Sequence, residues 1–252
     1  MKVTFLGTGT STGIPQIGCK CEVCNSTDER DKRLRASVLI QDANTNIIID
    51  CGPDFRQQLL RHPISHLDGV FITHEHYDHI AGLDDIRPLG KCVIYAENRV
   101  LSSIHRNLPY VFSDNPYPGV PKLALSEIEP NSEVLIDNLI IRPIRLMHAR
   151  LPILGFRIGK FAYLTDVKTI SKEAIEQLQG LDVLVLNALR HQEHIAHITL
   201  NEAIELSREI NPQTTYFTHF SHDLGFHQTI QNGLPKNMYL AFDNLEILLN
   251  DF

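Results

Sequence analysis

The feature that most constrains this chain is a run of six residues, HEHYDH, at positions 74–79. It follows a short apolar run, Gly69 to Thr73, that is typical of a buried strand. A strand in the core would not hold three imidazoles and an aspartate so close together, because each buried polar group needs a partner. At a strand end the chain turns, so ligands at alternate positions can converge. Imidazole and carboxylate suit zinc, manganese or iron, and the run therefore predicts a metal centre.

Three further ligand types follow apolar or β-branched runs later in the chain: His148, Asp166 and His219. The four ligands within residues 74–79 are too few to complete two metal sites, so these later residues are expected to supply the missing ligands. Any one of these three residues alone is more often structural. Three predicted strand ends that each finish in a ligand type favour a shared site.

Elsewhere the chain alternates short strands with short helices. Helices are predicted over Asp54–Arg61, Ile80–Pro88, Glu97–Asn107, Ser171–Leu178 and Thr199–Ile210. Strands outnumber helices, and neither a linker-like segment nor a repeat divides the chain. The 252 residues are therefore expected to form a single domain, 1–252, of the α/β (α+β) class, with two β-sheets flanked by helices.

Composition argues against several classes of protein. Hydrophobic residues make up 43% and charged residues 21% of the chain, which excludes a disordered protein. No apolar run approaches the ~20 residues that span a membrane, and the N-terminus has too few apolar residues for a signal peptide. The five cysteines are therefore expected to be reduced in a cytoplasmic protein. The net charge of −7 argues against a broad nucleic-acid surface.

The order HxHxDH, lone histidine, lone aspartate, last histidine resembles the metallo-β-lactamase-fold hydrolases. The opening run TFLGTGTSTGIP and the run IIIDCG before HEHYDH are similar to the same superfamily. The resemblance covers essentially the whole chain and implies an αββα sandwich. Within the superfamily it is closest to the phosphodiesterase branch, which includes the phosphoribosyl cyclic phosphodiesterase of phosphonate breakdown and the tRNA 3′-processing enzymes.

This resemblance implies two catalytic divalent metals, Zn²⁺ or Mn²⁺, held by seven residues. One metal would be bound by His74, His76 and His148, the other by Asp78, His79 and His219, and Asp166 would bridge them. Asp50 would hydrogen-bond a ligand imidazole and fix its tautomer. His197 matches the proton donor of the phosphodiesterase branch, so the expected catalytic residues are His197, Asp78 and Asp50.

A second cluster of ligand types lies in the run CKCEVC at residues 19–24. Cys19, Cys21 and Cys24 could supply three corners of a tetrahedral zinc site. The resemblance implies a structural Zn²⁺ with His222 as its fourth ligand, and His227 is the rival for that position. The other two cysteines of the chain lie in apolar runs and are expected in the core.

Two other segments have the composition of loops. The run GTGTSTG at residues 7–13 does not have the spacing of a dinucleotide-binding loop and is not followed by a helix pattern, so we expect a flexible loop beside the metal site. The segment Pro109 to Pro121 contains four prolines and is expected to be an ordered excursion or lid, or a surface loop without a special role.

The expected function is metal-dependent hydrolysis of a small phosphate diester, cyclic esters included, by a metal-activated hydroxide. A tRNA 3′-processing endoribonuclease is an alternative, disfavoured by the acidic charge and by the lack of a long basic insertion. A thioester or lactam hydrolase is a second alternative, and a non-catalytic metal-binding subunit is a third. The expected partner is a small-molecule phosphate ester, without a membrane, and a homodimer is left open.

Overall fold

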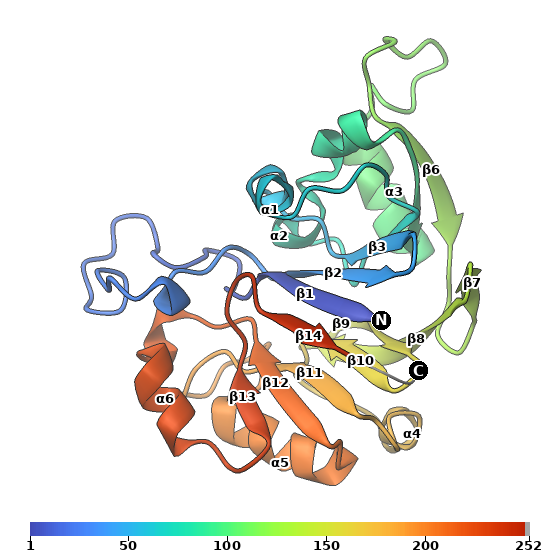
Figure 1. Cartoon of the computed structure of the whole chain (residues 1–252). Helices are drawn as coiled ribbons and strands as arrows, with labels where there is room; N and C mark the ends of the chain where they lie inside the picture. Colours follow the sequence, from blue (N-terminus) through green and yellow to red (C-terminus); the bar gives the residue numbers. More distant parts are fainter. Residues whose placement is uncertain (250–252) are drawn as a thin grey trace.

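Two mixed β-sheets face each other in the computed structural model, which describes residues 1–249 (Figure 1). In spatial order, the first sheet comprises β14 (Glu246–Leu248), β1 (Lys2–Gly7), β2 (Ser37–Asp42), β3 (Thr45–Ile49), β4 (Gly69–Phe71), β5 (Lys91–Ala96) and β6 (Lys122–Glu127). The second comprises β13 (Met238–Leu240), β12 (Thr214–Thr218), β11 (Val183–Asn187), β10 (Phe161–Leu164), β9 (Leu151–Ile158), β8 (Leu139–His148) and β7 (Val134–Ile136).

Helices cover the outer face of each sheet (Figure 1). The first sheet is covered by α1 (Phe55–Arg61), α2 (Tyr77–Ile80) and α3 (Asn98–Asn107), and the second by α4 (Lys172–Glu176), α5 (Leu200–Ile210) and α6 (His227–Gly233). Short 3₁₀ helices span Glu29–Asp31, Leu83–Leu89 and His222–Leu224. Within residues 1–249, none of these helices has the length and apolar character needed to cross a membrane.

Apolar side chains form three layers. The middle layer lies between the sheets, where Phe71, Phe156 and Tyr163 are completely buried. The outer layers pack the helices onto each sheet, for example Phe55 of α1 on the first and Ala203 of α5 on the second. This order of helix, sheet, sheet and helix confirms the predicted αββα sandwich. Hydrophobic burial on both sides of each sheet holds the four layers together.

Parallel pairing brings the site-bearing strand ends to one edge of each sheet. Strands β3, β4 and β5 run parallel to one another, and so do β10, β11, β12 and β13. Asp50 and His219 directly follow β3 and β12, and Asp166 lies two residues after the end of β10. All three adopt the left-handed backbone conformation, with φ values of 64°, 60° and 58° for Asp50, His219 and Asp166. Non-glycine residues rarely adopt it, and such residues cluster at functional sites. The sharp turn after each strand aims these side chains at the space between the sheet ends.

The predicted helix Ile80–Pro88 is wrong. The chain instead forms the four-residue helix α2 and a separate 3₁₀ helix, Leu83–Leu89. The two helices are separated at Gly82, whose N–H donates to the carbonyl of Cys51 at 2.8 Å rather than within the helix. Glycine is required there because a Cβ would come within 2.2 Å of the carbonyl oxygen of Gly52. Strand β6 and helix α6 were not predicted at all. The segment between α3 and β6 extends beyond the rest of the chain (Figure 1).

Candidate metal centre

The seven predicted metal ligands converge from both sheets. His74, His76, Asp78 and His79 lie between β4 and the end of α2, and the other three follow or end strands of the second sheet. The ligand atoms fall into overlapping groups in which all atoms lie within 4.8 Å of one another: His74 with His76 and His148; His74 with His79 and Asp166; and Asp78 with His79 and His219. The two main groups match the two ligand sets expected from the sequence.

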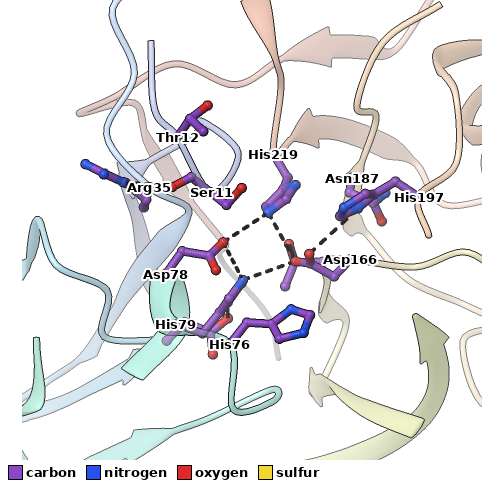
Figure 2. A network of polar contacts seen from close by, with 12 residues as sticks. Ser11, Thr12, Arg35, His76, Asp78, His79, Asp166, Asn187, His197 and His219 are labelled. Carbon is purple, nitrogen blue, oxygen red and sulfur yellow. Dashed lines mark hydrogen bonds and ion pairs between the residues drawn. The ribbon is translucent and has the colours of Figure 1, made fainter. Parts of the chain in front are cut away.

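Two carboxylates face two imidazoles at the heart of the site (Figure 2). His79 Nε2 lies 3.2 Å from Asp78 Oδ2 and 3.4 Å from Asp166 Oδ2. His219 Nε2 lies 3.8 Å and 3.3 Å from the same two oxygens. Asp166 therefore lies between the two groups, the position expected of a bridging carboxylate.

Several buried nitrogen atoms in this site have no hydrogen-bond partner among residues 1–249: His79 Nε2, His197 Nδ1 and both ring nitrogens of His219. Buried polar atoms without partners are uncommon because they lose their hydration. Imidazole nitrogens and carboxylate oxygens are the donors that zinc and manganese take. The residues present therefore fit a pair of divalent cations.

Hydrogen bonds from the opposite ring nitrogens orient two of these imidazoles. His79 Nδ1–H donates to Asp50 Oδ2 at 2.7 Å, so its Nε2 faces the site. Asp50 is completely buried and also accepts from the backbone N–H and hydroxyl of Thr73. His148 Nδ1–H donates to the carbonyl oxygens of Asp166 and Ala196 at 2.9 and 2.8 Å. Such bonds fix the tautomer that leaves the other nitrogen free for a metal.

The electrostatics of the site favour bound cations. Burial lowers the pKa of His74 well below its ordinary value, so this imidazole is neutral. Burial also opposes a charge on His79, yet the nearby carboxylates raise its pKa well above the ordinary value. Burial disfavours the ionised forms of Asp78 and Asp166 too, but the surrounding imidazoles hold the pKa of each well below its usual range. The carboxylates therefore carry negative charge that a dication would offset.

His197, the expected proton donor, lies beside the metal centre. Its Nδ1 is 3.7 Å from Asp166 Oδ1. Its ring stacks near that of His219, with centroids 5.0 Å apart. Its nitrogen also groups with His148 and Asp166 as a ligand set. The loop folds back because Ile198 N–H donates to the carbonyl of Val167, directly after Asp166.

Asn187, at the end of β11, braces the turn that carries Asp166 and was missed by the sequence analysis. Its Oδ1 accepts from the backbone N–H of Val167 at 2.7 Å, and its Nδ2 donates to the carbonyl of Val167 at 3.2 Å. The side chain is completely buried. A polar residue directly at the end of an apolar strand is the same signal that identified the other site residues.

The predicted cysteine site is also assembled. Cys19, Cys21, Cys24 and His222 group with their ligand atoms within 4.8 Å of one another. His222 Nδ1 lies 3.5 Å from Cys19 Sγ and 3.3 Å from Cys21 Sγ. Three thiols and one imidazole are a zinc donor set.

His227, the rival fourth ligand, lies elsewhere. It belongs to a group that we call the arginine cluster: Thr8, Asp31, Arg33, His227 and Asp243. Arg33 is buried and donates to Thr8 Oγ1 at 2.7 Å, and its Nη2 lies 3.0 Å from His227 Nδ1. The backbone N–H of His227 donates to Asp31. Helix α6 therefore directs His227 toward Arg33, away from the thiols. Cys51 and Cys92 are buried in the core, as expected.

Comparison with known proteins gives three findings. Residues 45–220 match the model of the Beta-lactamase superfamily domain. A Porphyromonas gingivalis protein named octanoyltransferase is 45% identical over 256 residues, covering 100% of this chain and 52% of that protein. The crystal structure of a diphosphatase from the PhnP family is 36% identical, with a TM-score of 0.93 over 99% of this chain and 98% of that chain.

Two further observations define the extent of these similarities. Human tRNase Z, short form, covers 99% of this chain and 100% of its own with a TM-score of 0.73, but at 22% identity it shows the fold alone. The chain spans about half the length of the first curated relatives that it matches. The chain therefore belongs to the beta-lactamase superfamily, where it has the metallo-β-lactamase fold and PhnP-family relatives.

Proposed function

We propose that this chain is a metal-dependent phosphohydrolase that cleaves a P–O bond of a small phosphodiester, the diphosphate linkage included. The single observation that supports this most is the 36% identity to a PhnP-family diphosphatase over nearly the whole of both chains. The convergent carboxylates and imidazoles of the metal centre supply the donors that such a reaction needs.

The chain's own residues have distinct tasks in this proposal. Two divalent cations, when bound by the seven ligands, make hydroxide available near neutral pH and offset the charge of a phosphoryl group. Asp50 holds His79 in the tautomer that presents Nε2. Asn187 and the turn after β10 hold Asp166 between the two ligand sets. These buried contacts keep the donors in place before substrate arrives.

His197 is the proposed proton donor to the leaving group. Burial lowers its pKa to about 3, so the imidazole is neutral at pH 7 in the free protein. An anionic phosphoryl group beside it would favour the protonated form and raise that pKa. The general-acid role therefore depends on bound substrate, and it makes turnover on a poor leaving group sensitive to pH.

The cysteine site is proposed to hold a structural zinc. It joins the loop after β1 to the 3₁₀ helix that follows His219. Three thiolates and one imidazole close a tetrahedral site without a free position, which excludes catalysis there. Its role is to fix the loop near the metal centre.

One observation favours a second candidate, an acyl-ester or thioester hydrolase. The Porphyromonas gingivalis relative is named octanoyltransferase, and it is 45% identical over this whole chain. This chain covers only 52% of that protein, so the named activity can belong to the other half. We keep the acyl hydrolase as the rival because the same residues would hold cations, and the water activation that these would supply also serves hydrolysis at a carbonyl.

The test is a substrate panel with protein loaded with Zn²⁺ or with Mn²⁺. It contains bis-p-nitrophenyl phosphate, a 2′,3′-cyclic phosphate, diadenosine diphosphate, pre-tRNA, nitrocefin and an octanoyl thioester. Turnover of the small phosphate substrates, abolished by chelator and restored by metal, is expected. Activity confined to the thioester would establish the acyl hydrolase instead. Activity confined to pre-tRNA would establish the endoribonuclease, and no turnover with metal bound would favour the non-catalytic subunit.

A further inference from the structure

A tight turn after β1 places two exposed hydroxyl groups at the rim of the metal centre. Gly13 N–H donates to the carbonyl of Thr10 at 2.9 Å, and Gly13 closes the turn with a φ of +64°. Ser11 and Thr12 form the tip and are exposed. In Figure 2 the Ser11 side chain points toward Asp78 and His219, whereas the Thr12 hydroxyl points away from them. Neither residue has a role in the ligand sets described above.

The backbone of this turn is attached to the strand end that carries a metal ligand. Thr10 N–H donates to the carbonyl of Phe220 at 2.8 Å, and Phe220 N–H donates to the carbonyl of Thr8 at 3.0 Å. Phe220 directly follows His219. The position of the turn relative to the centre is therefore set by paired backbone rather than by a free loop.

The tip also carries unused backbone donors. The N–H groups of Ser11 and Thr12 have no backbone acceptor among residues 1–249. Successive free amides at a turn form a concavity that binds anions, and hydroxyl groups add donors of the same kind. The turn thus offers two amides and the Ser11 hydroxyl beside a centre that would hold cations.

Arg35 braces the turn from outside the site. Its Nε–H donates to the carbonyl of Ser11 at 3.1 Å, and its Nη1 pairs with Asp54 Oδ1 at 3.0 Å. Asp54 also accepts from the backbone N–H of Arg35 at 2.8 Å. Arg35 therefore acts on the orientation of Ser11, and its guanidinium points away from the metal centre in Figure 2.

We infer that the turn formed by Ser11 and Thr12 binds the second phosphoryl group of a diphosphate-linked substrate. This inference rests on the proposed phosphohydrolase function. A water oxygen forms a bond to the attacked phosphorus and loses a proton to solvent. The bond from this phosphorus to the bridging oxygen breaks, and its electron pair stays on that oxygen, which departs with the second phosphoryl group. The second phosphoryl group carries the leaving charge and lies outside the metal ligands, where neutral donors at the rim stabilise it. The turn makes the diphosphate linkage the preferred substrate over a simple phosphodiester.

The experiment compares two substrates of the metal-loaded protein. Diadenosine diphosphate carries a second phosphoryl group, whereas bis-p-nitrophenyl phosphate carries one only. Replacing both hydroxyls, Ser11→Ala with Thr12→Ala, is expected to lower kcat/KM on the diphosphate by roughly 10-fold or more, since hydrogen bonds to charged groups are strong. The value on bis-p-nitrophenyl phosphate should stay within about 2-fold. Ser102→Ala, an exposed serine on α3, is the matched control and should change neither.

A binding measurement gives a readout independent of turnover. Titration calorimetry with methylenediphosphonate and methylphosphonate should show that the double variant loses affinity for the first only. Arg35→Lys keeps the charge but removes the Nε donor, and it should share the selective loss, mainly in KM. Melting temperature and metal content should not change, because the two hydroxyls are exposed.

The outcomes separate the inference from the proposed function. Equal losses on both substrates, or no loss on either, would overturn the role of the turn while leaving the phosphohydrolase intact. A wild-type protein that binds metal but turns over neither phosphate substrate would overturn the proposed function and this inference with it. A selective loss on the diphosphate in both turnover and binding supports both.

Discussion

The metal centre and the arginine cluster are both largely buried, and both contain histidine and aspartate. They differ in whether the histidine nitrogens have hydrogen-bond partners. In the metal centre, His79 Nε2 and both ring nitrogens of His219 lack partners among residues 1–249. In the arginine cluster, His227 Nδ1 lies 3.0 Å from a guanidinium nitrogen of Arg33 and accepts from it. The salt bridges among residues 1–249 place no lysine or arginine against the carboxylates of the metal centre. In the arginine cluster, the guanidinium of Arg33 supplies a permanent positive charge.

The difference appears in the charge states. Carboxylates around His79 raise its pKa well above its ordinary value, against the effect of burial. Burial, followed by the charge of Arg33, lowers the pKa of His227 to about 4. Burial also raises the pKa of Asp243 in the same cluster to about 6. A buried histidine is therefore a metal-ligand candidate when carboxylates and unpaired nitrogens surround it, and a structural residue when an internal cation satisfies it.

Removing the proposed bridging carboxylate should have the largest effect. Asp166→Asn removes a charge shared by both ligand sets, so turnover should fall by more than the roughly 10–100-fold typical of changes around the ligands. Metal analysis should show a lost ion, while the circular dichroism spectrum stays native. Asp114→Asn, an exposed control, should keep full activity and metal. Near-normal kinetics at saturating metal would contradict the bridging position of Asp166.

His197→Ala should come next, and its effect should depend on the leaving group. General acids typically contribute ~10²–10⁴-fold, so a loss of this size is expected on an alkyl phosphodiester. On bis-p-nitrophenyl phosphate the loss should be much smaller, because p-nitrophenolate leaves without a proton. Metal content should not change, although His197 groups with His148 and Asp166. Loss of metal would make His197 a ligand instead, and His191→Ala serves as the exposed control.

Asp50→Asn should cost about 10–100-fold in metal affinity or turnover. The amide keeps an acceptor for Thr73 but loses the charge that holds His79 in its tautomer. Equilibrium dialysis with zinc and steady-state kinetics measure the two effects. An unchanged metal affinity together with unchanged kcat would show that His79 is oriented without Asp50.

Cys21→Ser should remove one zinc ion and lower the melting temperature, since structural metal binding is coupled to folding. This variant should lose less turnover than the active-site variants, because the thiols lie outside the catalytic ligand sets. Glu22→Gln, an exposed neighbour in the same loop, is the control. A variant that keeps all its zinc and its melting temperature would rule out a structural site at these cysteines.

His227→Gln should leave turnover unchanged and alter only the pH dependence of stability. The unfolded chain protonates this histidine below about pH 6.5, whereas the folded chain does so below about 4. The free energy of unfolding of the wild type therefore falls as pH drops through this window, by up to about 3 kcal/mol from this residue. Denaturant titrations at pH 7 and pH 4.5 should show a smaller fall for the variant. Equal falls in both proteins would place the acid sensitivity elsewhere.

Local sequence was enough to identify most of the centre. The run HEHYDH contains four ligands within six residues, and Asp166 and His219 lie within two residues of the ends of the runs that form β10 and β12. Apolar runs and the residue types that follow them are local properties, so they can be recognised without knowledge of the fold. The spacing of the three cysteines in CKCEVC, residues 19–24, likewise indicated a metal site.

Other features depended on contacts between distant segments. The break between α2 and the 3₁₀ helix comes from Gly82 packing on Gly52, thirty positions earlier in the chain. His222 rather than His227 lies beside the thiols, because the fold places His222 next to Cys21 and places His227 next to Arg33. The place of His197 beside Asp166 depends on backbone pairing between residues 167 and 198.

The sequence by itself determined the chemistry of the ligands, the αββα architecture and the strand ends that carry the donors, because these follow from residue type and short-range pattern. Only the tertiary structure decided which histidines face carboxylates, which face Arg33, and which turn lies at the rim of the centre. The physical reason is that a side chain's charge state and hydrogen-bond partners are set by its neighbours in space. Those neighbours come from both sheets and are separated along the chain by tens to hundreds of residues, for example 208 between Arg33 and Ala241.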